Sequence, residues 1–248
     1  MAVAVITGVS RRIGIGAAVA RRLAEAGWDL FLHSWSPHDA EQPWGADPEG
    51  AAAIVADLRT RVRVEHLVAD LADPDAPAQL VAAAEGVYGR VDALVANHAR
   101  SSVATLEELT AAELDFSYAV NTRATLLLVK EFAARCPGPG RVVLMTSGQH
   151  RGPMPGELPY IASKGALHQV TASLAAHLAP RGITVNAVDP GATDTGYADA
   201  AAHAAVLALE PMGRWGEPDD AARLIAWLAS DASRWVTGQV LVSNGGGP

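Results

Sequence analysis

Apolar runs of two kinds alternate along this 248-residue chain. Short runs rich in Val, Ile and Leu are typical of buried strands, and longer segments with apolar residues at helical spacing are typical of helices. The predicted strands are 3–7, 30–34, 62–69, 91–96, 141–146, 183–188 and 239–242. The predicted helices are 17–26, 51–61, 76–88, 111–135, 160–179 and 219–230.

This alternation predicts βαβ units, and therefore a parallel sheet covered by helices on both faces. We expect an α/β fold: a single doubly wound Rossmann-type domain over residues 1–248, with seven parallel strands and a ligand crevice at their carboxyl ends. Two segments are too long for simple connections. Segment 36–50 holds three prolines and Trp44. We interpret segment 193–218 as a substrate lid, although its apolar stretch 198–209 also fits a helix packed on the core.

Composition narrows the class of protein. Half of the residues are hydrophobic and 19% are charged, which excludes a disordered chain. No apolar stretch reaches the roughly 18 residues of a membrane span, and the start lacks the order of a signal peptide, so we expect a cytoplasmic protein. The net charge of −8 argues against nucleic acid as a partner. The single cysteine, Cys136, and dispersed histidines predict no metal site.

A glycine-rich loop follows the first predicted strand. The strand ends at Thr-Gly (7–8), and Gly-Ile-Gly (14–16) opens the first helix. Glycines let the backbone approach a pyrophosphate, and the helix N-terminus supplies amide donors, so we predict a dinucleotide site. The second strand ends at His-Ser-Trp-Ser (33–36), without the acid that binds the ribose of NAD. Since Arg11 and Arg12 suit a 2′-phosphate, we favour NADP(H), with NAD(H) as the alternative.

Three polar residues form a candidate catalytic group. Ser147 ends the fifth predicted strand, Tyr160 follows 13 residues later, and Lys164 lies four residues beyond. Residues i and i+4 share one face of a helix, and an ammonium beside a phenol lowers the pKa of that phenol. Tyr160 can then give a proton to a carbonyl oxygen or take one from an alcohol, and Ser147 is expected to hydrogen-bond to the same oxygen. Alone, the Tyr-Lys pair fits a helix surface equally well.

With these motifs in place, the chain resembles the short-chain dehydrogenase/reductase family over essentially its whole length. The resemblance rests on Thr7-Gly8, Gly14-Ile15-Gly16, Asp70-Leu71, Asn97, Asn121, Ser147, Tyr160-x-x-x-Lys164 and Pro190-Gly191 followed by Thr195. It implies NAD(P)-dependent oxidation or reduction of alcohols and carbonyls. The expected cofactor contacts are Gly8, Ser10, Arg11, Arg12, Gly14, Ile15, Ser34, Asp70, Leu71, Asn97, Tyr160, Lys164, Pro190, Gly191 and Thr195.

The resemblance also implies a role for each catalytic residue. Tyr160 is the acid and base, and Ser147 orients the substrate. Lys164 binds the nicotinamide ribose and lowers the pKa of Tyr160, and Asn121 holds a water of the proton relay. The segment between Ser147 and Tyr160 is expected to line the substrate site. Its candidates are Gln149, His150, Arg151 and Met154, with His150 as a second acid and Arg151 as an anion site among the alternatives.

Two departures from the family pattern are visible. The loop after Gly8 carries two extra residues, so it is expected to bulge. The usual Asn-Asn-Ala-Gly reads Ala-Asn-His-Ala at 96–99, which has lost a glycine. His98 and Arg100 then stand near the crevice mouth, and a solvated pair of loop residues is the alternative.

We expect an NADP(H)-dependent carbonyl reductase that resembles 3-oxoacyl-acyl-carrier-protein reductases and acts on a small-molecule substrate. The alternatives are a sugar, polyol or steroid alcohol dehydrogenase and a catalytically silent dinucleotide-binding regulatory protein. The resemblance further implies a homotetramer or homodimer.

Overall fold

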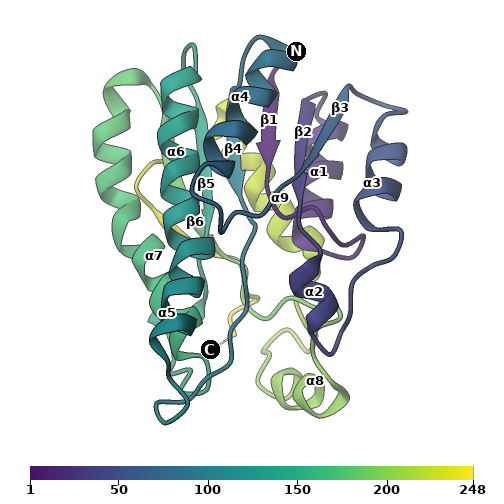
Figure 1. Ribbon diagram of the computed structural model, residues 1–248, viewed down its shortest axis with the longest axis vertical. Coiled ribbons are helices and arrows are strands. Elements are labelled where there is room, and N and C mark those ends of the chain that lie inside the picture. The colour runs from purple at the N-terminus through teal and green to yellow at the C-terminus, as the bar shows by residue number, and fades with distance from the viewer. Residues whose placement is uncertain (248) are drawn as a thin grey trace.

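The computed structural model describes residues 1–247 and contains one seven-stranded parallel sheet with helices on both faces (Figure 1). The strands are β1 (Val3–Ile6), β2 (Asp29–Ser34), β3 (Val64–Val68), β4 (Ala93–Ala96), β5 (Arg141–Met145), β6 (Thr184–Asp189) and β7 (Val240–Val242). The helices are α1 (Ile15–Glu25), α2 (Pro37–Glu41), α3 (Gly50–Leu58), α4 (Ala76–Tyr88), α5 (Ala111–Ser117), α6 (Ala124–Arg135), α7 (Leu158–Leu178), α8 (Ala200–Leu207) and α9 (Pro218–Ala229). The predicted α/β class and parallel sheet are confirmed.

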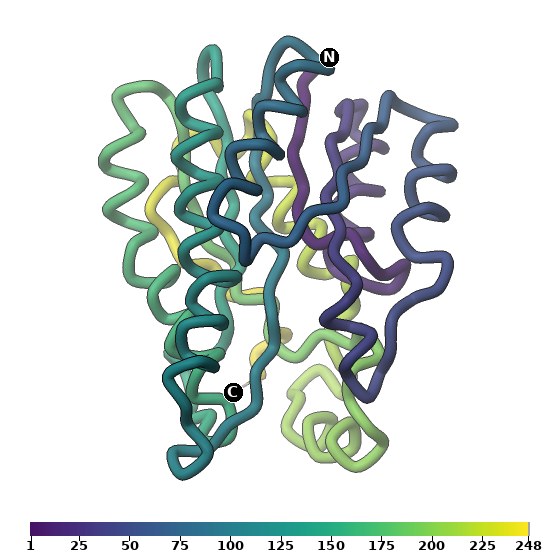
Figure 2. Tube along the Cα trace, viewed as in Figure 1, coloured from purple at the N-terminus to yellow at the C-terminus, as the bar shows by residue number. Residues whose placement is uncertain are grey.

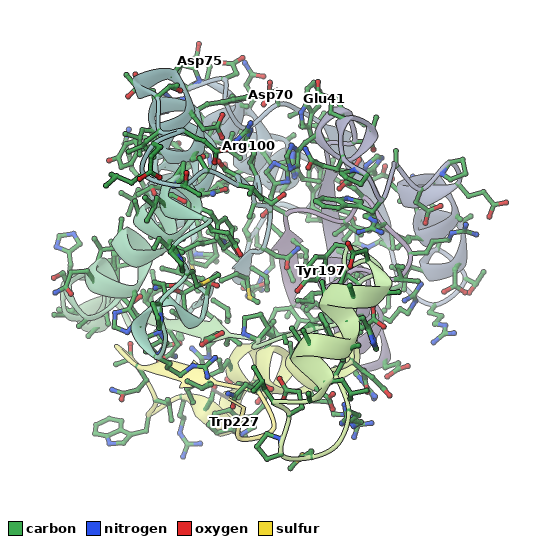
Figure 3. The ribbon with its side chains drawn as sticks, turned by 90° about the horizontal axis from the view of Figure 1, so that it is seen from below. Glu41, Asp70, Asp75, Arg100, Tyr197 and Trp227 are labelled. Atoms are coloured by element: carbon green, nitrogen blue, oxygen red, sulfur yellow. The ribbon has the colours of Figure 1, made fainter. Side chains whose placement is uncertain are left out.

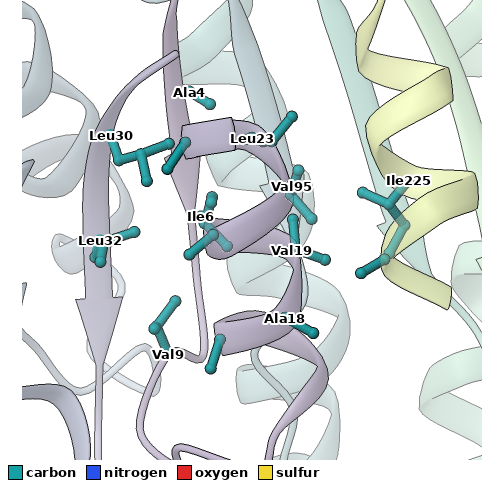
Figure 4. Packing of buried hydrophobic residues seen from close by; sticks show 14 of the residues in the cluster. Ala4, Ile6, Val9, Ala18, Val19, Leu23, Leu30, Leu32, Val95 and Ile225 are labelled. Atoms are coloured by element: carbon teal, nitrogen blue, oxygen red, sulfur yellow. The ribbon is translucent and has the colours of Figure 1, made fainter. Parts of the chain in front are cut away.

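Two hydrophobic layers hold the sheet between its helices. The first layer packs α1, α3 and α9 on one face, and the second packs α4, α6 and α7 on the other. Figure 4 shows the first layer, where Ile6 of β1 and Leu30 of β2 face Val19 and Leu23 of α1. The inner strands β1, β4 and β5 are buried at every position, which is why they read as continuous apolar runs.

The order of the strands creates a crevice. It runs β3-β2-β1-β4-β5-β6-β7, so the chain moves outward from β1 and then returns to the other side of β1 with β4. Connections leave β1 and β4 in opposite directions, and the loops after these two strands separate. The crevice therefore lies at the carboxyl ends of β1 and β4.

The long helix predicted over 111–135 is interrupted. A π-helical turn, η1 (Tyr118–Arg123), lies between α5 and α6 and contains Asn121. Such π-helical turns are rare inside α-helices, and they often occur at functional sites. This difference could not be predicted from spacing.

Both long segments contain short helices, α2 and α8, and lie at the same edge of the molecule (Figure 2). α8 has no buried residue, so its apolar composition does not reflect a place in the core. This excludes the core-packed helix as an explanation of 198–209. Within residues 1–247, none of the helices has the combined length and apolarity needed to cross a bilayer.

Candidate active site

A cavity opens at the crevice between β1 and β4. Its lining comes from the loop after β1, the segment after β2, the loop after β4 and Thr195. The lining residues are Gly8, Ser10, Arg11, Gly14, Ile15, Trp35, His38, Asp39, Asn97, His98, Ala99 and Thr195. Seven of the predicted cofactor residues are among them. Sequence reasoning did not single out Trp35, His38 and Asp39, and their place in the segment that follows the second strand was the available signal.

The loop after β1 and the start of α1 pack so tightly that Gly8 and Gly16 have no room for a Cβ atom. Gly8 has φ +76, and a Cβ there would lie 2.7 Å from the Cα of His98. A Cβ on Gly16 would lie 2.4 Å from the carbonyl oxygen of Gly8. Asn97 Nδ2 donates to the carbonyl oxygens of Thr7 and Gly8, at 3.0 and 3.1 Å. The backbone is therefore held where a pyrophosphate can approach it closely.

The end of β2 holds one flank of the bulged loop. The Gly8 amide donates to His33 Nδ1 at 3.3 Å, and His33 Nε2 donates to the Ala69 carbonyl at 2.9 Å. Burial lowers the pKa of His33 to about 4, so its ring is neutral at pH 7 and can accept this bond. The Trp35 amide donates to Ser10 Oγ at 3.0 Å. Ser10 thus fixes the loop with the side chain that we had expected to meet a phosphate.

Asp47 holds the other flank. The amide and Nε of Arg12 both donate to Asp47 Oδ2 at 2.9 Å, and the Gly50 amide donates to Oδ1 at 3.1 Å. Arg12 also pairs with Glu49. The hydrogen bonds from Arg12 hold the pKa of the Asp47 carboxyl well below its usual range. The Arg12 side chain is therefore engaged in ion pairs that hold the loop, whereas Arg11 lines the cavity. The sequence gives no signal that Arg12 forms an ion pair with Asp47, which lies 35 residues later in the chain.

Asp47→Asn is expected to weaken NADPH binding about tenfold, because the amide lacks the charge that orders the bulged loop. Fluorescence titration with NADPH measures this. Asp57→Asn is the matched control, since Asp57 is an exposed acid on α3. Equal affinity in wild type and Asp47→Asn would show that the loop keeps its shape without this charge.

The three predicted catalytic residues lie together. Ser147 follows β5, and Tyr160 and Lys164 lie in the first turns of α7. Lys164 is 2% exposed, and its Nζ donates to the Met145 carbonyl at 2.9 Å. The same Nζ lies 5.8 Å from the centre of the Tyr160 ring. The Ser147 hydroxyl is close enough to the phenol to hydrogen-bond with it.

The electrostatics differ from the sequence-based expectation in one respect. Burial raises the pKa of Tyr160 above its ordinary value, with a further increase from the Glu157 carboxylate, and Ser147 acts in the opposite direction. We had expected Lys164 to lower this pKa, but here burial dominates and the ammonium is directed to Met145. Burial lowers the pKa of Lys164 to about 8. At neutral pH Tyr160 is thus a protonated phenol, and Lys164 is mostly an ammonium.

Asn121 connects the loop after β4 to α7. Its Oδ1 accepts from the Arg100 amide at 2.7 Å, and its Nδ2 donates to the Arg100 carbonyl at 3.0 Å and to Ser163 Oγ at 2.8 Å. The water-holding role that the resemblance implies stays a prediction. The Arg100 side chain pairs with Glu113, so it is not a solvated partner of His98, which lines the cavity.

Several predicted cofactor residues lie outside the cavity lining. They are Arg12, Ser34, Asp70, Leu71, Tyr160, Lys164, Pro190 and Gly191. Ser34 is buried at the end of β2, and its Oγ lies 2.8 Å from His66 Nε2 of β3. Its hydroxyl therefore contacts a side chain of the neighbouring strand, and its contact with a cofactor stays a prediction. Asp70 Oδ1 accepts from the Ala72 amide at 2.8 Å.

The predicted substrate residues follow β5. Arg151 Nε donates to the buried Asp189 at 2.9 Å, and its Nη1 donates to the Gly247 carbonyl at 3.0 Å. This side chain holds the end of β6 and the C-terminal segment. His150 is exposed and lies beside His168, with ring centres 4.7 Å apart. Gln149 and Met154 are partly buried in the same segment.

Comparisons with known proteins agree with this architecture. A family model described as enoyl-(acyl carrier protein) reductase matches residues 8–247. The uncharacterized oxidoreductase YjdA of Bacillus subtilis is 42% identical over 98% of this chain and 96% of its own length. A short chain dehydrogenase from Burkholderia cenocepacia, solved in complex with NADP, is 35% identical with a TM-score of 0.88 over 98% of this chain and 96% of that one. The reductase LugOII, which catalyzes keto-reduction at C1 during lugdunomycin biosynthesis, is 35% identical with a TM-score of 0.86 over 99% and 96%.

The chain therefore belongs to the short-chain dehydrogenase/reductase family of oxidoreductases.

Proposed function

We propose that the protein is an NADPH-dependent carbonyl reductase in which Tyr160 protonates the carbonyl oxygen. The observation that carries this proposal is the placement of Ser147, Tyr160 and the buried Lys164 together in the crevice beside the cavity. The NADP complex of the Burkholderia cenocepacia relative and the keto-reduction catalyzed by LugOII support it.

The cavity has the features that a nicotinamide dinucleotide requires. Gly8 and Gly16 permit close approach of the backbone, and Arg11 supplies a positive charge. Arg11 Nη2 would lie 3.6 Å from a Cβ on Gly196, so this guanidinium stands between the phosphate loop and the lid segment. A guanidinium there suits a phosphate of the cofactor, which favours NADPH over NADH.

Bound NADPH would supply a hydride to the carbonyl carbon, and the protein supplies the proton. The Ser147 hydroxyl and the Tyr160 phenol both donate to the carbonyl oxygen, which places the substrate and stabilises the negative charge that develops. The phenol proton moves to that oxygen as the alcohol forms. The Lys164 ammonium then stabilises the tyrosinate until a proton returns.

The proposed substrates are ketones with an apolar portion, 3-oxoacyl thioesters among them. The support is the lid segment 193–218, whose helix α8 places Ala, Val and Leu side chains at the surface near the crevice. The homotetramer or homodimer implied by the family resemblance remains a further proposal. Exposed Phe116 and Tyr118 offer apolar surface for it.

The proposal is tested by fluorescence titration with NADPH and NADH, followed by a panel of ketones and 3-oxoacyl thioesters. We expect NADPH to bind at least about tenfold more tightly, because one charge-assisted phosphate contact is worth about 1.5–3 kcal/mol. We also expect carbonyl-dependent consumption of NADPH. Tighter binding of NADH, with alcohol oxidation as the main activity, would contradict the proposal.

A further inference from the structure

The lid segment is fixed at one side by aromatic contacts. Trp215, 5% exposed, stacks on His203 of α8 with ring centres 4.8 Å apart and planes at 9°. Its Nε1 donates to the His203 carbonyl at 3.0 Å. Tyr197, just before α8, meets Trp215 edge-on with ring centres 6.0 Å apart. Tyr197 is nevertheless 45% exposed, so Trp215 covers only part of its ring.

A second aromatic neighbour of Tyr197 comes from the distant segment 36–50. The Trp44 ring lies edge-on to it, with centres 6.3 Å apart and planes at 80°. Trp44 Nε1 donates to Asp39 Oδ1 at 3.1 Å, and the Trp44 ring also meets the His38 ring at 6.5 Å. His38 and Asp39 both line the cofactor cavity. A continuous set of contacts therefore runs from this cavity through Trp44 to the lid.

Tyr197 is connected to the phosphate loop through the residue that precedes it, Gly196. Its phenol is one of the groups that raise the pKa of Tyr160, and Glu157 raises the pKa of both tyrosines. The preceding Gly196 packs on the phosphate loop, where a Cβ would lie 3.0 Å from Ile13 Cδ1. Figure 3 shows Tyr197 beside α8, viewed from the crevice side of the molecule. Gly196 and Tyr197 thus lie between the phosphate loop and the lid residue Trp215.

We propose that Trp44 is a positioning residue, which holds Tyr197 and the lid segment beside the phosphate loop and thereby couples the cofactor cavity to the lid. The expected effect of Trp44 on turnover rests on the proposed function. The structural part of the inference stands on the ring contacts and hydrogen bond of Trp44 alone.

The surroundings of Trp44 indicate that it positions Tyr197 and does not stabilise the hydrophobic layers of the fold. Trp44 is only partly buried, it belongs to neither hydrophobic layer, and α2 beside it has no buried residue. Its ring partners are His38, which lines the cavity, and Tyr197, which lies just before the lid helix α8. Loss of the ring is therefore expected to loosen the lid without lowering the stability of the sheet and its helices.

The first test is amide hydrogen exchange of residues 197–208, with and without NADPH. Trp44→Ala is expected to speed exchange there about threefold to tenfold, the factor that corresponds to losing one aromatic pair. Trp44→Phe, which keeps an aromatic edge, is expected to restore most of the protection. Trp235→Ala is the matched control, because Trp235 is 96% exposed. Unchanged lid exchange in a folded Trp44→Ala protein would overturn the inference.

The second test is a double-mutant cycle with Tyr197→Ala. Each single variant is expected to raise KM for a ketone about threefold to tenfold and to change kcat less, and the double variant to be no worse than either single one. Additive effects would contradict the proposed coupling. Because hydrogen exchange needs no turnover, the two proposals can fail separately. An inactive protein with a Trp44-dependent lid refutes only the proposed reaction.

Discussion

Tyr160→Phe is expected to lower turnover about a thousandfold and to leave NADPH binding within about twofold, because proton transfer from a positioned acid contributes about 10²–10⁴ in rate. The substitution removes the phenol hydroxyl and keeps the ring that packs in the crevice. The proton for the carbonyl oxygen then has to come from a donor other than the positioned phenol.

Steady-state kinetics and NADPH titration measure the two halves of this expectation. Tyr118→Phe is the matched control, because Tyr118 is 51% exposed. The mechanism predicts wild-type turnover in the control. Turnover near that of wild type in Tyr160→Phe would remove Tyr160 from the chemistry.

Lys164→Met is expected to lower turnover about a hundredfold. The methionine fills a similar volume but leaves the Met145 carbonyl without its donor and the tyrosinate without a neighbouring charge. Lys130→Met is the control. Lys130 is the other lysine of the chain, on the exposed side of α6, and it pairs with Glu131. Equal losses in the two variants would show that the effect is not specific to the crevice.

The pH dependence of wild-type turnover follows from the same lysine. Its pKa of about 8 means that the ammonium is present below pH 8 and is lost as the pH rises through that value. Reduction is therefore expected to decrease on the alkaline side of about pH 8. The residual rate of Lys164→Met is expected to lack this decrease. A wild-type rate that stays constant well above pH 8 would contradict the role of the ammonium.

The fold could be predicted from local pattern because the sheet is buried on both faces. Strands such as β1 and β5 then read as apolar runs, and Ala76–Tyr88 was predicted with the bounds that the structure shows. The hydrogen bonds of Asn121 in the π-turn were not predictable, because its partners Arg100 and Ser163 are brought to it only by the folded chain.

The candidate site could be predicted where spacing alone places residues together. Tyr160 and Lys164 share a helix, and Ser147 ends a neighbouring strand. The contacts of Arg12 could not be predicted, because Asp47 reaches it from a loop of irregular structure. The pKa of Tyr160 was expected to move downward from the charge of Lys164, and burial moves it upward. Burial of a single side chain cannot be predicted from the residues beside it in sequence.

The most direct measurement of the central claim uses NADPH in which both hydrogens at C4 are replaced by deuterium, with a panel of ketones and 3-oxoacyl thioesters. Mass spectrometry of the products detects where the label goes. We predict that each alcohol formed by the wild-type protein carries one deuterium at the former carbonyl carbon, and that Tyr160→Phe forms almost none. Tight NADPH binding with no labelled alcohol from any member of the panel would contradict the account.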